Sequence, residues 1–244
     1  MKLRSLILLS CTLLYIVNAV SQENDTTVIE KTNSILRLAV IKNSDDTRTL
    51  TGTLTYRDKD TREIKPIQQA SLNFYTGLDS MANLGKLITD EKGIAKCIVP
   101  ADFKYLRNEE GLIRFSVSFD GNELFESNDT EAEVVDIQIK ISIEVLDSVK
   151  TVTVEAYKIL GGNITEPLTE ESIAICVGRM FSHLKLGEIE LADGTGTFEF
   201  PSDIPGDSMG ILKVIAKFDE HESYATVVKS ENATWGTPTS HHTV

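Results

Sequence analysis

The sequence predicts an all-β protein in which two tandem antiparallel β-sandwich domains follow an N-terminal signal peptide. Three observations predict this class: an export-type N-terminus, an internal repeat at an offset of 101 residues, and a two-residue hydrophobic period within each copy. A two-residue period places alternate side chains on opposite faces of a strand, whereas a helix needs a period of about 3.6 residues. We find no convincing amphipathic helix after the signal region, which argues against a helical or mixed fold.

The first 19 residues have the pattern of a signal peptide. Two basic residues precede an apolar run over residues 6–17, and the small Ala19 follows at the expected cleavage position. The run is shorter than the roughly 20 residues that a bilayer-spanning helix needs, so we expect removal rather than anchoring. The competing interpretation is a lipoprotein signal, with lipid on Cys11, but the apolar run continues past that residue. We therefore expect an exported protein, in the periplasm, at the cell surface or outside the cell.

An internal repeat organises the rest of the chain. Identical residues recur at an offset of 101, and small loop insertions then shift the offset to 102 at Leu84 and to 99 at Phe119. The shared residues are those of a common backbone, namely glycine, proline, an aromatic and apolar positions, so the duplication preserves a scaffold rather than a reactive group. Gly93 and Gly194 fall at turn positions where we expect a positive φ. The pairs at an offset of 101 include Tyr56 and Tyr157, Pro66 and Pro167, Ser71 and Ser172, Gly77 and Gly178, Gly93 and Gly194, Pro100 and Pro201, and Asp102 and Asp203.

The repeat sets the domain boundaries that we expect. A flexible N-terminal segment occupies residues 20–33, the first β-sandwich repeat residues 34–133, the second residues 134–232, and a C-terminal tail residues 233–244. Each repeat has about 100 residues, enough to bury a hydrophobic core without a disulfide framework.

Within each copy the pattern predicts short strands. Ile113, Phe115 and Val117 alternate with polar residues, as do the isoleucines at alternate positions of 137–145, so each strand has one buried and one wet face. About seven short strands in 100 residues are typical of an antiparallel sandwich, although a barrel has the same signature. The expected strands are 35–42, 49–57, 70–76, 85–89, 93–99 and 113–119, and then 137–145, 150–158, 171–177, 186–191, 195–200 and 212–218.

Two motifs add a family resemblance. The run from Thr89 to Ala95 (TDEKGIA) and the run from Phe119 to Asn122 (FDGN) resemble those of bacterial immunoglobulin-like and carboxypeptidase-regulatory-like (transthyretin-like) domains. The second copy keeps the skeleton but lacks the family's glycine at Glu220. The resemblance implies immunoglobulin-like sandwiches and a non-catalytic module of exported proteins of the Bacteroidetes type.

Composition and residue types argue against nucleic-acid binding, direct membrane binding, metal binding and catalysis. The net charge of −13 is the wrong sign for gripping nucleic acid or an anionic membrane surface. The few histidines and the acidic turns have no convergent ligand pattern, so we expect no metal and no cofactor. Cys97 reads as a small core residue, Cys176 lies on another strand, and no serine has a catalytic setting, so we expect neither a disulfide between them nor an enzyme.

Binding is the remaining function. Spacer or partner-binding activity of a β-sandwich pair is our expectation, with a protein of the cell envelope as partner; the alternative is glycan or ligand binding at the cell surface, for which aromatic platforms are scarce. Tyr105 is the one loop aromatic that we single out. Trp235 lies in the tail, where we expect it to pack against a sheet end or mark a join. The tail also resembles segments that lead into a C-terminal anchor, so we expect membrane association only through a partner or a missing anchor.

Overall fold

The structure is a computed structural model that describes residues 30–78 and 80–239. The predicted signal peptide and residues 20–29 lie outside the described residues. From Lys31 onward the chain forms one compact unit. Thr32, which falls in the segment expected to be flexible, is held by backbone hydrogen bonds to Leu124 (2.8 Å) and Glu126 (3.0 Å).

The described chain is an all-β sandwich, as the sequence predicts, with a single short 3₁₀ turn at Gly161–Asn163 among the described residues. We refer to β1–β8 as the first strand set and to β9–β16 as the second strand set. The first strand set is β1 (Ser34–Lys42), β2 (Arg48–Arg57), β3 (Ile64–Pro66), β4 (Ser71–Thr76), β5 (Ala82–Ile88), β6 (Ile94–Val99), β7 (Leu112–Phe119) and β8 (Asn128–Val135). The second strand set is β9 (Ile137–Leu146), β10 (Val149–Ile159), β11 (Thr165–Pro167), β12 (Ser172–Gly178), β13 (His183–Glu190), β14 (Thr195–Glu199), β15 (Leu212–His221) and β16 (Ala225–Ala233).

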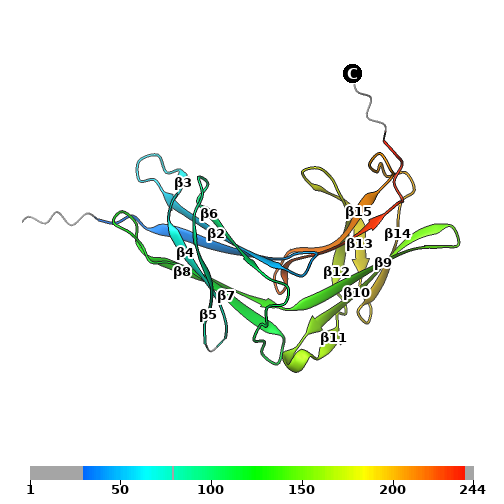
Figure 1. The fold of residues 1–244 in the computed structure, drawn as a ribbon, viewed down its shortest axis with the longest axis horizontal. Helices are drawn as coiled ribbons and strands as arrows, with labels where there is room; N and C mark the ends of the chain where they lie inside the picture. Colours follow the sequence, from blue (N-terminus) through cyan, green and yellow to red (C-terminus); the bar gives the residue numbers. More distant parts are fainter. Residues whose placement is uncertain (1–29, 79, 240–244) are drawn as a thin grey trace, which may run out of the picture. The chain divides into compact units, whose positions relative to one another are not determined.

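The strands form three sheets, and one of them joins the two strand sets. It runs β13-β12-β15-β16-β1-β2-β3, with β6 also on β2, and can be followed in Figure 1 from the blue β1 and β2 to the orange β15. Its central pair, β1 with β16, is parallel and short: Ile41 is paired with Thr226 and Lys42 with Val227. The other sheets are β5-β4-β7-β8 and β11-β10-β14 with β9 on β10, and their strand pairs are antiparallel.

Each strand set has its own hydrophobic core. The first core lies between Leu36 and Val134 in the sequence, and the second between Ile137 and Ala233. The alternation predicted for β7 is confirmed, because Ile113, Phe115 and Val117 are fully buried. On β9 the alternation weakens along the strand: Ile137 and Ile139 are buried, Ile141 and Ile143 are partly buried against the second core, and Val145, near the hairpin, is 57% exposed. The fully buried large side chains are Phe74, Phe115, Leu50, Leu54, Leu72, Ile113, Ile137, Leu168, Ile173, Ile175, Leu191 and Leu212.

Glycine is required where the backbone is left-handed. Gly93 and Gly194 have φ of 74° and 76°, as predicted, and a Cβ at Gly93 would collide with the carbonyl oxygen of Leu54. Gly121 has φ 81°, and Glu220, where the second copy lacks the glycine, still has φ 48°. The left-handed backbone therefore recurs at this position, but in the second strand set it lies within β15, at the register shift between Phe218 and His221, and is held by a residue that adopts it less readily than glycine.

Candidate functional site

Asp136 is the one residue between β8 and β9, and both of its backbone groups are bonded. Its N–H donates to the carbonyl of Gly111 (2.9 Å), and its own carbonyl accepts from the N–H of Ile159 (2.7 Å). The residue is 2% exposed. A charged side chain this deeply buried needs partners, because an unpaired buried charge is costly.

Three cations of the first strand set surround the Asp136 carboxylate. Arg107 donates to Oδ2 from Nη2 (2.6 Å) and Nε (2.9 Å), and Lys42 Nζ and an Arg48 Nη2 donate to Oδ1, the lysine at 3.1 Å. Lys42 Nζ also donates to the carbonyl of Ile137 at the start of β9 (2.6 Å). We call Asp136, Lys42, Arg48 and Arg107 the joint cluster. It ties the end of β1 and the start of β2 to the connection between the strand sets.

Burial and charge oppose each other in the joint cluster. Burial alone would raise the pKa of Asp136, but the nearby charges of Arg48, Lys42 and Arg107 outweigh it and hold that pKa below its ordinary value. For Lys42, burial and the neighbouring Arg48 lower the pKa, against the opposing pull of Asp136. The carboxylate is therefore stabilised as an anion and is not available as a proton donor near neutral pH.

Tyr105, predicted as a loop contact residue, lies beside the joint cluster rather than on an open surface. The Arg48 guanidinium sits 4.7 Å from the centre of its ring, and the ring packs on Phe103 (4.8 Å) and Phe115 (5.6 Å) of the first core. Its hydroxyl is buried and has no hydrogen-bond partner among the described residues, and burial raises its pKa to about 12. One ring face is thus covered by Arg48. A hollow of about 460 Å³ lies next to it, lined by Lys42, Asp45, Asp46, Arg48, Ala101, Asp102, Phe103, Tyr105, Arg107, Asp136, Gln138 and Ile159.

Trp235, the other predicted contact residue, is half-buried against the second core. Its ring packs on Phe200 at 5.3 Å, and Lys150 Nζ donates to its carbonyl oxygen (2.7 Å). The next residue, Gly236, donates to the carbonyl of Gly210 (2.9 Å). Trp235 and Tyr105 pack on different cores, so the structure does not bring them together in one site.

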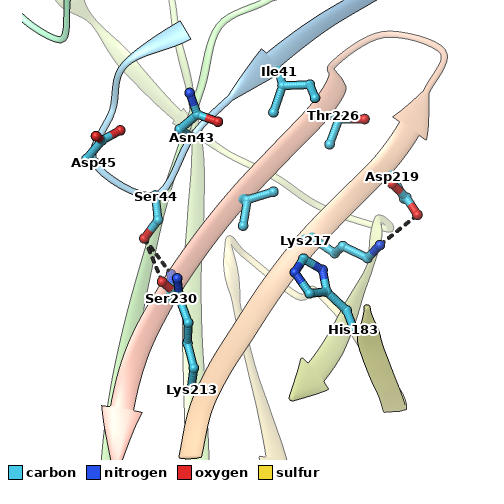
Figure 2. Close-up of a pocket in the computed structure, with 11 residues that line it drawn as sticks. Ile41, Asn43, Ser44, Asp45, His183, Lys213, Lys217, Asp219, Thr226 and Ser230 are labelled. Carbon is cyan, nitrogen blue, oxygen red and sulfur yellow. Dashed lines mark hydrogen bonds and ion pairs between the residues drawn. The ribbon is translucent and has the colours of Figure 1, made fainter. Parts of the chain in front are cut away.

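A second hollow, of about 620 Å³, lies where β1 meets β16 and β15 on the outer face of the long sheet (Figure 2). Ser44 holds its edge: the Ser44 and Ser230 hydroxyls are 2.8 Å apart, and the Ser230 N–H donates to Ser44 Oγ (2.9 Å). Lys217 is bonded to Asp219 (2.7 Å) across the floor. The lining residues are Ile41, Asn43, Ser44, Asp45, His183, Lys213, Lys217, Asp219, Thr226, Val228 and Ser230.

The acidic turns at Asp58 and Asp90 and the side chain of His221 have structural partners. Asp90 Oδ1 accepts from the N–H groups of Lys92 (2.8 Å) and Ile94 (2.9 Å), as Asp58 Oδ1 does within its own turn. His221 Nε2 lies 3.3 Å from a Glu171 oxygen and its ring stacks on Tyr224. No group of three or more metal-ligating side chains occurs in the part of the chain that the structure describes, and His241 and His242 lie outside it.

The two cysteines are free and buried, Cys97 with 5% of its surface exposed and Cys176 with 1%. Burial raises the pKa of both thiols. Since the thiolate is the nucleophile, both are poor candidates for covalent chemistry.

Sequence reasoning missed the joint cluster, because its members are spread from Lys42 to Asp136. One signal was readable: Asp136 interrupts the apolar run of residues 134–137, and a charge in such a run marks a buried partner set.

No protein-family model and no curated protein matches the chain. Within residues 30–78 and 80–239, no helix is long and apolar enough to cross a membrane.

Proposed function

We propose that this chain is a non-enzymatic, exported interaction module in which two tandem immunoglobulin-like β-sandwich domains are held in one fixed relation to each other. It acts as a spacer or as a partner-binding accessory of a cell-envelope complex. The joint cluster around Asp136 is the observation that carries the proposal.

The connection between the strand sets supports a fixed relation. A linker that allows movement needs several residues with free backbone groups, whereas here the single residue Asp136 has both of its backbone groups bonded. Around it, Lys42 binds both Asp136 and the carbonyl of Ile137. Lys229 Nζ donates to the Ser44 carbonyl (2.9 Å) on the other side. Bending at this joint would break these bonds together.

The order of the strands supports a tandem duplication. In both strand sets the fourth strand has a bulge in its pairing with the fifth, between Phe74 and Tyr75 in one and between Ile175 and Cys176 in the other. A left-handed residue precedes that strand in each set, Gln69 with φ 54° and Glu170 with φ 61°. These paired irregularities fall at the offset of 101 found in the sequence.

The chemistry of the polar groups supports a non-enzymatic role. The carboxylate of Asp136 is enclosed by cations, the two thiols are buried and protonated, and the acidic turns are occupied by backbone N–H groups. A catalytic site needs polar groups that face the substrate and are free to hydrogen-bond to it. A protein partner fits better than a glycan, because both aromatic candidates, Tyr105 and Trp235, are packed on a core.

Distance measurements between spin labels test the fixed relation. We would label Lys96→Cys and Glu199→Cys, both at exposed positions, in a Cys97→Ala, Cys176→Ala background. We expect one narrow distance distribution, and a markedly broader one after Asp136→Ala. Asp58→Asn, which removes a surface carboxylate bonded to Lys65, is the control and leaves the distribution narrow. A broad distribution in the parent protein would contradict the proposal.

Fractionation of native cells with mass spectrometry of the intact chain tests export. We expect a chain that begins at Val20 in the periplasmic or extracellular fraction. A lipid on Cys11 would replace this interpretation of the N-terminus, and a cytosolic full-length chain would contradict export.

A further inference from the structure

The outer face of β12 is made of small residues, and this creates a groove. Ala174, Cys176 and Gly178 point away from the second core, while Ile173, Ile175 and Val177 are fully buried within it. Because no side chain on this outer face of β12 is larger than the cysteine thiol, the side chains of the neighbouring strands rise above it. The floor is therefore low along the whole length of β12.

Apolar residues continue that floor onto the neighbouring strands. Ile215 on β15 is paired with Cys176 and is only 1% exposed, although it faces outward. Val228 on β16 lines the hollow of about 620 Å³. A third hollow, of about 360 Å³, lies over β12 and β13. It shares His183, Lys217 and Asp219 with the hollow of about 620 Å³, so the two make one continuous groove. We call it the outer groove. It runs from β1 across β16, β15 and β12 to β13.

One cation in the outer groove lacks a carboxylate. Lys217 pairs with Asp219 (2.7 Å) and Lys185 with Glu188 (2.5 Å). Lys213 lies opposite the neutral Asn232, and its ammonium has no hydrogen bond or ion pair with any described residue. Figure 2 shows it among the residues that line the hollow of about 620 Å³. Asp45 and Asp219 also line this hollow, and Lys213 is the cation there that is left to pair with an incoming carboxylate.

We propose that the outer groove binds an extended, acidic peptide segment of a partner protein, with Lys213 receiving a Glu or Asp side chain and the floor at Ala174 and Val228 receiving apolar ones. The proposal rests on the proposed function and names the chemistry of its partner. Five strands spaced about 4.8 Å apart span about 19 Å, the length of roughly six extended residues. A groove of that length fits a strand-like segment that alternates acidic and apolar side chains.

Part of the groove belongs to the first strand set. Ile41, Ser44 and Asp45 form its wall at β1, and Ser44 is fixed there by its bonds to Ser230. The groove is thus complete only while β1 is paired with β16, which links peptide binding to the fixed joint.

A phage-displayed library of random decapeptides, selected on the purified protein, tests the proposal. We expect Asp and Glu to be enriched among the selected peptides. The synthetic form of a selected peptide should bind at least about tenfold more weakly to Lys213→Glu, and its Asn and Gln analogue should lose as much on the parent protein. Arg114→Glu, the same charge change at the matching position of β7, is the control and leaves Kd unchanged.

A second variant blocks the floor without changing charge. Ala174→Asn copies the residue at the equivalent position of β4 and should weaken the peptide at least about fivefold while the melting temperature stays near that of the parent. Selected peptides without acidic residues, equal binding to Lys213→Glu, or selection of a glycan but no peptide on an array would overturn the proposal. If no peptide is selected while the spin-label distance distribution stays narrow, the peptide-binding proposal for the outer groove is wrong and the proposed fixed relation of the two domains is unaffected.

Discussion

The outer faces of β7 and β15 occupy matching positions, yet one is closed by ion pairs and the other is open. On β7, Arg114 faces Glu133 of β8 and donates to it from Nη2 (2.6 Å) and Nε (2.8 Å). On β15 the matching lysine, Lys213, faces Asn232. The same backbone register therefore carries a satisfied charge pair in one strand set and an unsatisfied cation in the other.

The difference extends to the strand beside it. On β4 the outward positions hold Asn73 and Tyr75, and the Asn73 amide donates to Asp120 (3.2 Å). On β12 the same positions hold Ala174 and Cys176. The outer face of the first strand set is thus filled by paired polar side chains, whereas its counterpart in the second strand set carries small side chains and is the face that we propose for binding. The predictions below test this difference, from the largest expected effect to the smallest.

Asp136→Ala should have the largest effect, because it leaves the buried Arg48 and the partly buried Lys42 and Arg107 without their carboxylate. We expect a loss of about 3–5 kcal/mol in the free energy of unfolding, measured by urea denaturation. Asp58→Asn, which removes a single ion pair with the 39% exposed Lys65, should cost clearly less. Equal losses for both variants would show that the joint cluster contributes no more than a surface pair.

Acid should open the first strand set before the second. The described carboxyl groups with a lowered pKa are Asp45, Asp58, Asp90 and Asp136, none of which lies in the second set. A carboxyl with a lower pKa in the folded state stabilises the fold above its unfolded pKa of about 3.9 and loses that contribution as pH falls toward the folded value. Hydrogen exchange at pH 3 should therefore be faster in β2 and β7 than in β10 and β15. The reverse order would contradict the comparison.

Glu220→Gly should stabilise the protein by about 0.5–1 kcal/mol, because Glu220 holds a left-handed backbone that glycine adopts without strain. Thermal melting measures the gain. The opposite exchange, Gly121→Glu in the first strand set, should cost more than this gain, since a Cβ there would lie 2.9 Å from the N of Ser127. A loss of stability in Glu220→Gly would mean that its side chain has a compensating role.

Arg114→Ala and Lys213→Ala should have the smallest effects on stability. The Arg114 pair is about a third exposed, 34% for the arginine and 40% for Glu133, so its removal should cost less than about 1 kcal/mol. Lys213→Ala should leave the melting temperature unchanged, because the lysine has no described partner to lose. A clear loss for Lys213→Ala would mean that this lysine stabilises the fold and is not kept for a ligand.

Much of the fold could be predicted from the sequence because its signals are local. The alternation of Ile113, Phe115 and Val117 gave β7, and the glycines at 93 and 194 gave left-handed turns. Strand β8 was missed because its first six residues, 128–133, are polar apart from Ala132, as suits an edge strand with one face in water. A two-residue parallel pair such as that of β1 and β16 leaves no periodic trace, so the long sheet could not be predicted.

The candidate sites were harder to predict than the fold. The joint cluster joins residues up to 94 positions apart, and only the lone charge of Asp136 pointed to it. The outer groove depends on a difference between the copies, Glu133 against Asn232, which the repeat alignment contains at its offset of 99. The residues that the two copies share indicate the scaffold, whereas the positions at which they differ indicate the groove.

The short overlap of β1 with β16 has a mechanical consequence. The last two residues of β1 pair with the second and third residues of β16, so the N-terminal end of β1 and the C-terminal end of β16 point away from the overlap in opposite directions. Tension applied along the chain at these two ends passes directly from one strand to the other and shears the pairs Ile41 with Thr226 and Lys42 with Val227. The bonds beside the overlap, from Ser44 to Ser230 and from Lys229 to the Ser44 carbonyl, share that load.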